Sequence, residues 1–165
     1  MPVTLRARSA AVLPLLIVAV LVATLFSLTP SADAASRRQK IGNGMDVVRA
    51  QKGDPYKYGA DGPRAFDCSG LVYYSFRKAG FNNVPRTSTA QAKFMNRIKK
   101  KNLRRGDFLY FYDGAAKPSN VYHLGVFAGW KDGRRAIVHA PYGNKRVHRE
   151  RVWTGDFFAG SLRGR

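Results

Sequence analysis

The apolar positions of this chain follow a helical period in its first half and a period of two in its second half. The strongest helical pattern covers residues 67–79, and Gly80 follows at a position typical of a C-terminal cap. Its apolar stripe consists of Leu71, Val72, Ser75, Phe76 and Ala79. A shorter helix is predicted for residues 45–52, and a third from residue 87 or 88 to about residue 99.

Alternating apolar and polar residues predict the strands of the second half. Three strands are expected at residues 108–112, 123–128 and 136–140, and a weaker fourth at residues 147–152. Helices followed by antiparallel strands are typical of an α+β domain, with the helices packed on one side of a small sheet.

The first 34 residues have the pattern of an export signal. Arg6 and Arg8 precede an uncharged apolar stretch at residues 10–28, and residues 32–34 read Ala-Asp-Ala, a signal-peptidase site. An uncleaved membrane anchor is the alternative, since the apolar stretch is long enough to span a bilayer. Both interpretations predict a protein that acts outside the cytoplasm.

Two further segments complete the expected organisation. Residues 35–43 are polar and basic and predict a short flexible leader, and residues 44–165 predict one globular domain. The chain carries a formal net charge of +19, and removing two arginines and one aspartate with residues 1–34 leaves +18. For an exported protein this charge suits anionic cell-wall polymers rather than nucleic acid, although it also fits solubility alone.

A single cysteine, Cys68, stands out in an exported protein because it has no disulfide partner within the chain. It follows Asp67, the expected helix cap, so the helix dipole and amides favour a thiolate near neutral pH. His123 and His139 lie on neighbouring predicted strands. A nucleophile, a base and a group that orients the base are what acyl transfer requires. An inert buried cysteine with two structural histidines is the alternative.

The residues around Cys68 carry a family resemblance. The segment Asp-Cys-Ser-Gly-Leu-Val at residues 67–72 resembles the nucleophile motif of the NlpC family, the papain-like endopeptidases of bacterial cell walls. Further matches occur in the order typical of the family, and the resemblance extends from residue 45 to about residue 152. These matches are residues 53–59, residues 84–88 with Gln91, residues 105–109, residues 123–126 and residues 137–141.

The resemblance implies a papain-like fold and a set of catalytic roles. Cys68 is expected to attack the peptide carbonyl, His123 to transfer the proton and His139 to orient His123. The backbone N–H of Cys68 is expected to help bind the oxyanion. The family typically cleaves the D-γ-glutamyl–diaminopimelate bond of peptidoglycan stems, without a cofactor.

The resemblance also implies substrate contacts. Tyr56 is expected to assist catalysis or to touch the substrate, and Asp67 and Ser69 to hold the free amino end of a short stem peptide. Helix capping explains Asp67 equally well.

The catalytic roles constrain the hairpin between the histidine strands. Asp132 and Gly133 favour a two-residue turn, whose regular register would place His123 and His139 on opposite faces of the sheet. We therefore predict a five-residue loop at residues 129–133 that sets the histidines opposite each other, or a bulge of equal effect.

Three other interpretations fit parts of the sequence pattern. An N-acetylmuramoyl-L-alanine amidase would use the same triad, and a cationic wall-binding protein without catalysis would explain the charge. A zinc site of Cys68, His123, His139 and His148 has no standard ligand spacing, so no metal site is predicted. We expect a monomer that binds peptidoglycan stems and anionic wall polymers, but no nucleic acid.

Overall fold

The computed structural model describes residues 31–164. The predicted export signal lies almost entirely outside the described residues, and its cleavage stays a prediction. The chain divides into a unit of residues 1–32 and a compact unit of residues 33–165, to which the fold below belongs. Within residues 31–164, no helix has both the length and the apolar character needed to cross a membrane.

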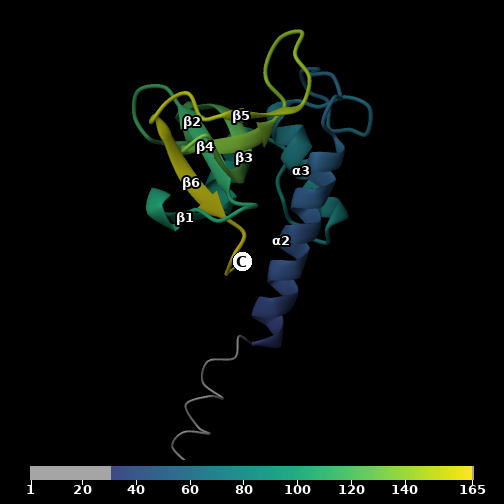
Figure 1. The fold of residues 1–165 in the computed structure, drawn as a ribbon, viewed down its shortest axis with the longest axis vertical. Helices are drawn as coiled ribbons and strands as arrows, with labels where there is room; N and C mark the ends of the chain where they lie inside the picture. Colours follow the sequence, from purple (N-terminus) through teal and green to yellow (C-terminus); the bar gives the residue numbers. More distant parts are fainter. Residues whose placement is uncertain (1–30, 165) are drawn as a thin grey trace, which may run out of the picture. The chain divides into compact units, whose positions relative to one another are not determined.

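Within the described residues, three α-helices precede the sheet (Figure 1). They are α2 (Ala32–Ala50), α3 (Cys68–Lys78) and α4 (Ser88–Phe94). Helix α3 agrees with the sequence prediction within one residue at each end, because its polar cap and its glycine stop are both strong local signals. Two short 3₁₀ turns, η1 (Lys100–Asn102) and η2 (Pro118–Asn120), lie in connections.

The second half of the domain is a six-stranded antiparallel sheet in the order β1-β6-β2-β3-β4-β5. Four strands match the predicted ones: β2 (Phe108–Tyr112), β3 (Val121–Lys131), β4 (Arg134–His139) and β5 (His148–Arg151). The sequence missed two: β1 (Asn96–Ile98) and β6 (Phe157–Ser161). The predicted α+β class is confirmed.

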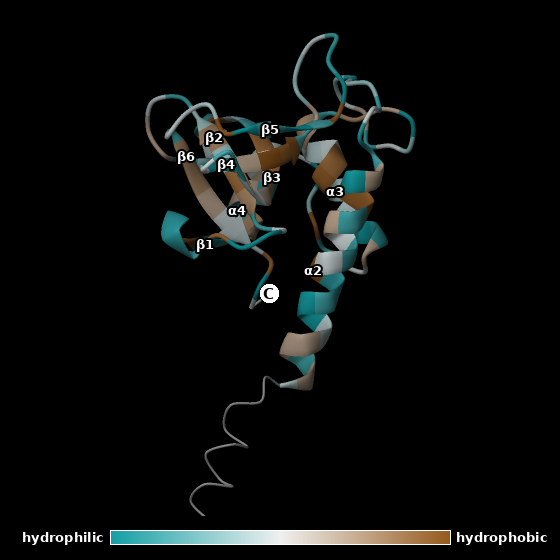
Figure 2. Cartoon of the chain, viewed as in Figure 1, coloured by the Kyte–Doolittle hydropathy of each residue, from teal (hydrophilic) through white to brown (hydrophobic). Residues whose placement is uncertain are grey.

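The main core lies between the helices and one face of the sheet. Figure 2 shows hydrophobic colouring on α3 and on strand β3, whereas most of α2 is hydrophilic. The core combines side chains of α2 and α3 with those of β2, β3 and β4, among them Met45, Val48, Leu71, Phe76, Phe108, Tyr110, Leu124 and Val138. A smaller apolar cluster occupies the other face of the sheet, with Leu109, Phe111, Phe127 and Ile137. Helix α3, which begins at Cys68, is thereby fixed against the strands that carry His123 and His139.

Two sequence predictions about the helices are wrong. Residues 35–43 are not a flexible leader but part of α2, which buries Ile41 as well as Met45 and Val48. The third predicted helix ends at Phe94 rather than near residue 99, because residues 96–98 pair with β6 as strand β1. In both cases packing against the rest of the domain outweighs the local pattern.

The hairpin between β3 and β4 turns at two residues, as its sequence favours. Asp132 and Gly133 have φ angles of 50° and 70°, and Lys131 pairs with Arg134. The five-residue loop predicted for residues 129–133 is therefore wrong.

A bulge in strand β3 places the two histidines on one face of the sheet. The register of β3 with β4 shifts between Phe127 and Gly129, so that Ala128 is an extra residue. Because side chains alternate along a strand, one extra residue reverses the facing of every residue beyond it. His123 and His139 consequently share one face of the sheet. The bulge, which was predicted as the alternative to the five-residue loop, is present and brings both histidines to one side.

Candidate active site

Cys68 is the first residue of helix α3, and its neighbour Asp67 is the cap. The carboxylate of Asp67 accepts a hydrogen bond of 2.6 Å from the backbone N–H of Gly70. The backbone N–H groups of Leu124, Ser69 and Cys68 itself face the sulfur. Since Leu124 directly follows His123, this contact joins the nucleophile to the strand that carries the expected base.

Arg86 holds the cap from the other side. Its guanidinium donates to both carboxylate oxygens of Asp67, at 3.1 and 2.8 Å, and to the hydroxyl of Ser69 at 3.1 Å. Ser69 and the backbone N–H of Gly59 donate to Asp67 as well, at 3.0 Å each. Burial raises the pKa of Asp67, but the hydrogen bonds from Arg86, Gly70 and Ser69 outweigh it, so the pKa lies below its usual value.

His123 on β3 and His139 on β4 form a buried pair. Nε2 of His123 lies 2.7 Å from Nδ1 of His139. The register of the two strands, continued by one pair, sets His139 opposite Gly125, so the histidines are diagonal neighbours rather than directly opposed. The ring of Trp153 covers both, with centroids 5.9 and 5.7 Å away. Burial lowers the pKa of each imidazole, which keeps the pair uncharged at neutral pH.

A cavity of about 580 Å³ brings the three expected catalytic residues together. Cys68, His123 and His139 all line it, together with Glu150 and Trp153. We call it the histidine cavity. The nucleophile, its expected base and the residue expected to orient that base thus face one space large enough for a peptide.

A second cavity of about 370 Å³ adjoins the first at the nucleophile. Its lining includes Asp67, Ser69 and Arg86 and also Cys68 and Tyr56, which both belong to the histidine cavity as well. We call it the Arg86 cavity. The two cavities therefore lie on either side of Cys68 and meet at its side chain.

The comparisons with known proteins agree with this geometry. The sequence model of the NlpC/P60 family matches residues 53–160, which is more than half of the chain. This chain belongs to the NlpC/P60 family. A probable endopeptidase of Corynebacterium glutamicum is 38% identical over 110 residues, which are 67% of this chain and 46% of that relative. The chain therefore spans just under half the length of that relative.

Solved structures of NlpC/P60 proteins share the fold. The peptidoglycan hydrolase RipB of Mycobacterium tuberculosis superposes with a TM-score of 0.65 at 24% identity, over 84% of this chain and 71% of that one. RipD of the same organism, described as a non-catalytic NlpC/p60 domain protein adapted to peptidoglycan binding, gives 0.59 at 18% identity, over 74% and 97%. At such identities the likeness concerns the fold alone.

Burial dominates the ionisation of Cys68 in this member of the NlpC/P60 family. Burial and the charge of Asp67 raise the pKa of the Cys68 thiol to about 11, and the amides of Leu124, Ser69 and Cys68 oppose the rise without cancelling it. The sequence prediction of a thiolate near neutral pH is therefore wrong for the free protein. The helix start stabilises the anion as predicted, but the loss of water around the sulfur has the larger effect.

This ionisation predicts how Cys68 reacts with iodoacetamide. The rate should keep rising with pH up to about 11, because the reactive thiolate fraction follows the raised pKa. Alkylation in urea should instead level off above a pKa of about 8.5, the value for an exposed thiol. A plateau already at pH 6–7 in the native protein would show a preformed thiolate–imidazolium pair.

Sequence reasoning missed two residues of this site. Arg86 was recognised as part of a family segment, but without the fold nothing indicated that it pairs with Asp67. Glu150 lies 3.4 Å from Nε2 of His139 because β5 pairs with β4, and the weak pattern of β5 contained no sign of that register.

Proposed function

We propose that this protein is a secreted cysteine endopeptidase that hydrolyses the peptide stems of peptidoglycan, at the D-γ-glutamyl–diaminopimelate bond. The observation that carries the proposal is the contact of 2.7 Å between His123 and His139 in the cavity that Cys68 lines. The probable endopeptidase of Corynebacterium glutamicum, which is 38% identical over 110 residues, supports hydrolysis of a peptide bond, and the family resemblance of the motifs supports peptidoglycan as the source of that bond. The place of action outside the cytoplasm follows from a wall substrate and from the pattern of residues 1–34.

The hydrogen bond between the histidines determines which nitrogen acts as the base. Since Nε2 of His123 is engaged by His139, Nδ1 is the nitrogen left to take the thiol proton. His123 then carries its own proton on Nε2 and donates it to Nδ1 of His139. In this arrangement His139 holds the ring of His123 in the correct tautomer and orientation.

The reaction follows from these positions. As the proton moves from Cys68 to Nδ1 of His123, the sulfur attacks the peptide carbonyl and forms a tetrahedral intermediate. The N–H of Cys68 and the hydroxyl of Tyr56 are proposed to stabilise its oxyanion. His123 protonates the leaving amine, and a water activated by the same nitrogen then hydrolyses the acyl-enzyme.

The Arg86 cavity is proposed to receive the amino end of the stem. Arg86 contacts two carboxylates, Asp67 at 2.8 Å and Asp61 at 3.3 Å, so the cluster has one excess negative charge in a strongly basic protein. A free ammonium group is the substrate feature that this charge attracts. Asp67 accepts five hydrogen bonds within the protein, so it contributes its charge, while Ser69 and Tyr56 contribute direct contacts.

Mass spectrometry of a peptidoglycan digest tests the function. New termini at D-glutamate and diaminopimelate support the proposal, whereas free muramic acid carboxyl groups and intact stems identify an amidase. A protein that binds walls but releases no fragment would be a wall-binding protein like RipD, whose fold this chain shares.

High salt is expected to separate wall attachment from catalysis. Raising NaCl from 0.05 to 0.5 M should weaken binding to whole walls by about tenfold or more, because salt screens the charge of the chain. Hydrolysis of small soluble muropeptides should change by less than about twofold. Pull-down with purified walls measures the attachment, and a chromatographic assay of muropeptides measures the hydrolysis. If salt reduces attachment and hydrolysis equally, the positive charge acts in substrate binding at the active site.

A further inference from the structure

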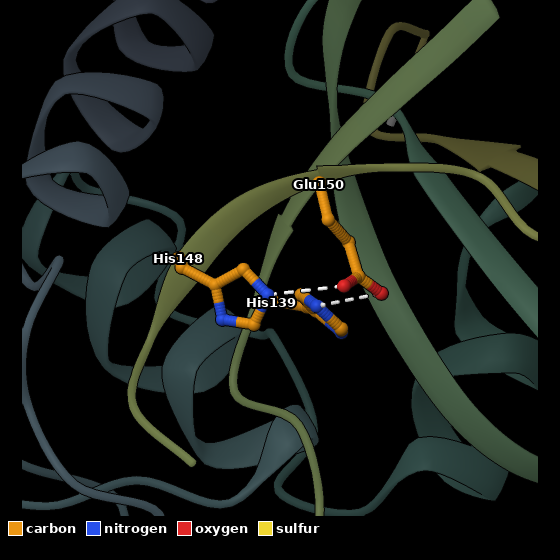
Figure 3. A group of neighbouring side chains, drawn as sticks. All are labelled: His139, His148 and Glu150. Carbon is orange, nitrogen blue, oxygen red and sulfur yellow. Dashed lines mark hydrogen bonds and ion pairs between the residues drawn. The ribbon is translucent and has the colours of Figure 1, made fainter.

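A second group of ionisable side chains adjoins the expected catalytic pair. His148 and Glu150 lie on β5, and His148 pairs directly with His139 of β4. All three side chains point into the same space because residues two apart on a strand share a face. Figure 3 shows the imidazole of His148 and the carboxylate of Glu150 turned toward His139.

The distances within this group are those of a metal site. Glu150 lies 3.0 Å from Nε2 of His148 and 3.4 Å from Nε2 of His139, one carboxylate oxygen facing each ring. One ligand atom from each residue lies within 4.8 Å of the others. Ligands about 2.1 Å from a tetrahedral zinc ion are about 3.4 Å apart, so small side-chain rotations suffice to bind an ion.

The contacts of His148 prepare it to bind a metal. Its Nδ1 lies 2.7 Å from the carbonyl oxygen of Arg146, which only an N–H can satisfy. Such a backbone partner is typical of metal-binding histidines, because it fixes the tautomer and directs Nε2 at the ion. Nε2 faces the carboxylate of Glu150 at 3.0 Å, so a metal ion bound between them would have both ligands at hand.

His139 supplies the independent observation. Its side chain is only 2% exposed, and its Nε2 makes no hydrogen bond to any residue in the described part of the chain. The carboxylate oxygen of Glu150 lies 3.4 Å from this nitrogen without forming a hydrogen bond, and a buried nitrogen left without one is rare and calls for an explanation. Nδ1 is already engaged by His123, so Nε2 is the atom available to a ligand.

We propose that His139, His148 and Glu150 bind a divalent transition-metal ion, with Zn²⁺ as the best match, and that the bound ion switches the peptidase off. Two imidazoles and one carboxylate are a common zinc ligand set, and His139 and Glu150 line the histidine cavity, from which a water could supply the fourth ligand. This site was not predicted from the sequence, where no metal ligand was expected. The zinc site considered there consisted of Cys68 and the three histidines and did not include Glu150. The inhibitory part of the proposal rests on the proposed peptidase function.

The tautomers of the two rings make metal binding and catalysis exclude each other. Catalysis needs the proton of His123 on Nε2, donated to Nδ1 of His139, whose own proton is then on Nε2. Zinc needs the lone pair of that same Nε2, so the proton of His139 moves to Nδ1 and donates to Nε2 of His123. His123 then carries its proton on Nδ1, the position that has to accept the proton of Cys68. Each ring keeps one proton, but on the nitrogen that blocks the reaction.

Calorimetric titration with Zn²⁺ tests the site without any activity. The Cys68→Ala protein is used because a free thiol is itself a zinc ligand. One equivalent should bind, and His148→Gln should weaken binding at least tenfold. Arg151→Gln on the same strand is the matched control and should bind as the parent does, since the side chain of Arg151 is exposed and its ion-pair partner among residues 31–164 is Asp132 at 3.9 Å. Equal binding by the His148→Gln protein, checked for an unchanged melting temperature, overturns the site.

Activity and nitrogen chemical shifts test the switch. With EDTA, His148→Gln should hydrolyse muropeptides as the parent does, and the zinc concentration for half inhibition should rise at least tenfold in that variant. In the ¹⁵N spectrum, zinc should move the proton of His123 from Nε2 to Nδ1. If zinc binds at His148 but changes neither the hydrolysis rate nor the His123 tautomer, the proposed switch is wrong. If the protein has no hydrolytic activity, calorimetry still tests the metal site and the ¹⁵N spectrum still tests the tautomer change.

Discussion

Replacing Cys68 by serine should lower peptidoglycan hydrolysis by about 10³-fold or more. The serine hydroxyl keeps the shape of the side chain and the contacts of the sulfur with the amides of α3 and Leu124. It loses the anion that attacks the carbonyl, because a hydroxyl in a buried position ionises far less than a thiol does. Release of soluble fragments from purified walls, followed by mass spectrometry, measures the effect.

Ser75→Ala is the matched control for this change. Ser75 lies two turns further along the same helix, is buried and makes no side-chain hydrogen bond to the described residues, so its hydroxyl has no part in the site. The Ser75→Ala protein should digest walls at the parent rate. If the Cys68→Ser protein also does so while its melting temperature is unchanged, Cys68 is not the nucleophile and the proposed function fails.

Replacing Arg86 by methionine should lower the free energy of unfolding by about 2–3 kcal/mol at pH 7. The pair with Asp67 is largely buried, with 28% of the Arg86 side chain and 11% of the Asp67 side chain exposed. Without the guanidinium, Asp67 keeps a carboxylate in a poorly solvated position and the Arg86 cavity loses a wall. Urea unfolding followed by circular dichroism measures the difference.

The pH dependence distinguishes a lost ion pair from simple loss of packing. In the parent the pKa of Asp67 is lowered, so the carboxylate contributes stability above its unfolded pKa, and this contribution disappears as the pH falls through the folded value. In Arg86→Met, burial still acts to raise the pKa of Asp67 while the lowering hydrogen bonds from Arg86 are gone, so the carboxylate takes up a proton at a higher pH than in the parent and the buried charge is relieved. The difference between the two proteins should therefore be largest near pH 7 and shrink toward pH 4. A constant difference across this range would assign the effect to packing.

Arg49→Met provides the control for removing a paired arginine. Arg49 contacts Asp46 at 2.9 Å, but the two side chains are 38% and 71% exposed. Water screens such a pair, so this variant should change the free energy of unfolding by less than about 0.5 kcal/mol at any of these pH values.

Local signals predicted the nucleophile helix and four of the strands. Helix α3 has a cap, an apolar stripe and a stop, each specified by adjacent residues. Strand β6 has no comparable signal, because it lies between β1 and β2 with every residue buried and so lacks alternation. Helix α2 was cut short because residues 35–43 are polar, although buried Ile41, Met45 and Val48 repeat at helical spacing.

The site was predicted where the residues carry family motifs, and missed where it depends on pairing between distant segments. Cys68, His123 and His139 stand in recognisable segments, and the cavity that they share agrees with their expected roles. The ionisation of Cys68 was mispredicted because sequence shows the helix start but not the depth of burial. Glu150 became a neighbour of His139 only through the register of β4 with β5.

The extra residue at Ala128 makes the proposed site sensitive to the length of strand β3. Loss of that one codon would remove the bulge, and with the same two-residue turn His139 would face away from His123. The chain would keep Cys68 and both histidines, yet His123 would lose the partner that is proposed to orient it. A length change of one residue would thus dismantle the proposed triad while all three of its residues stay in the sequence.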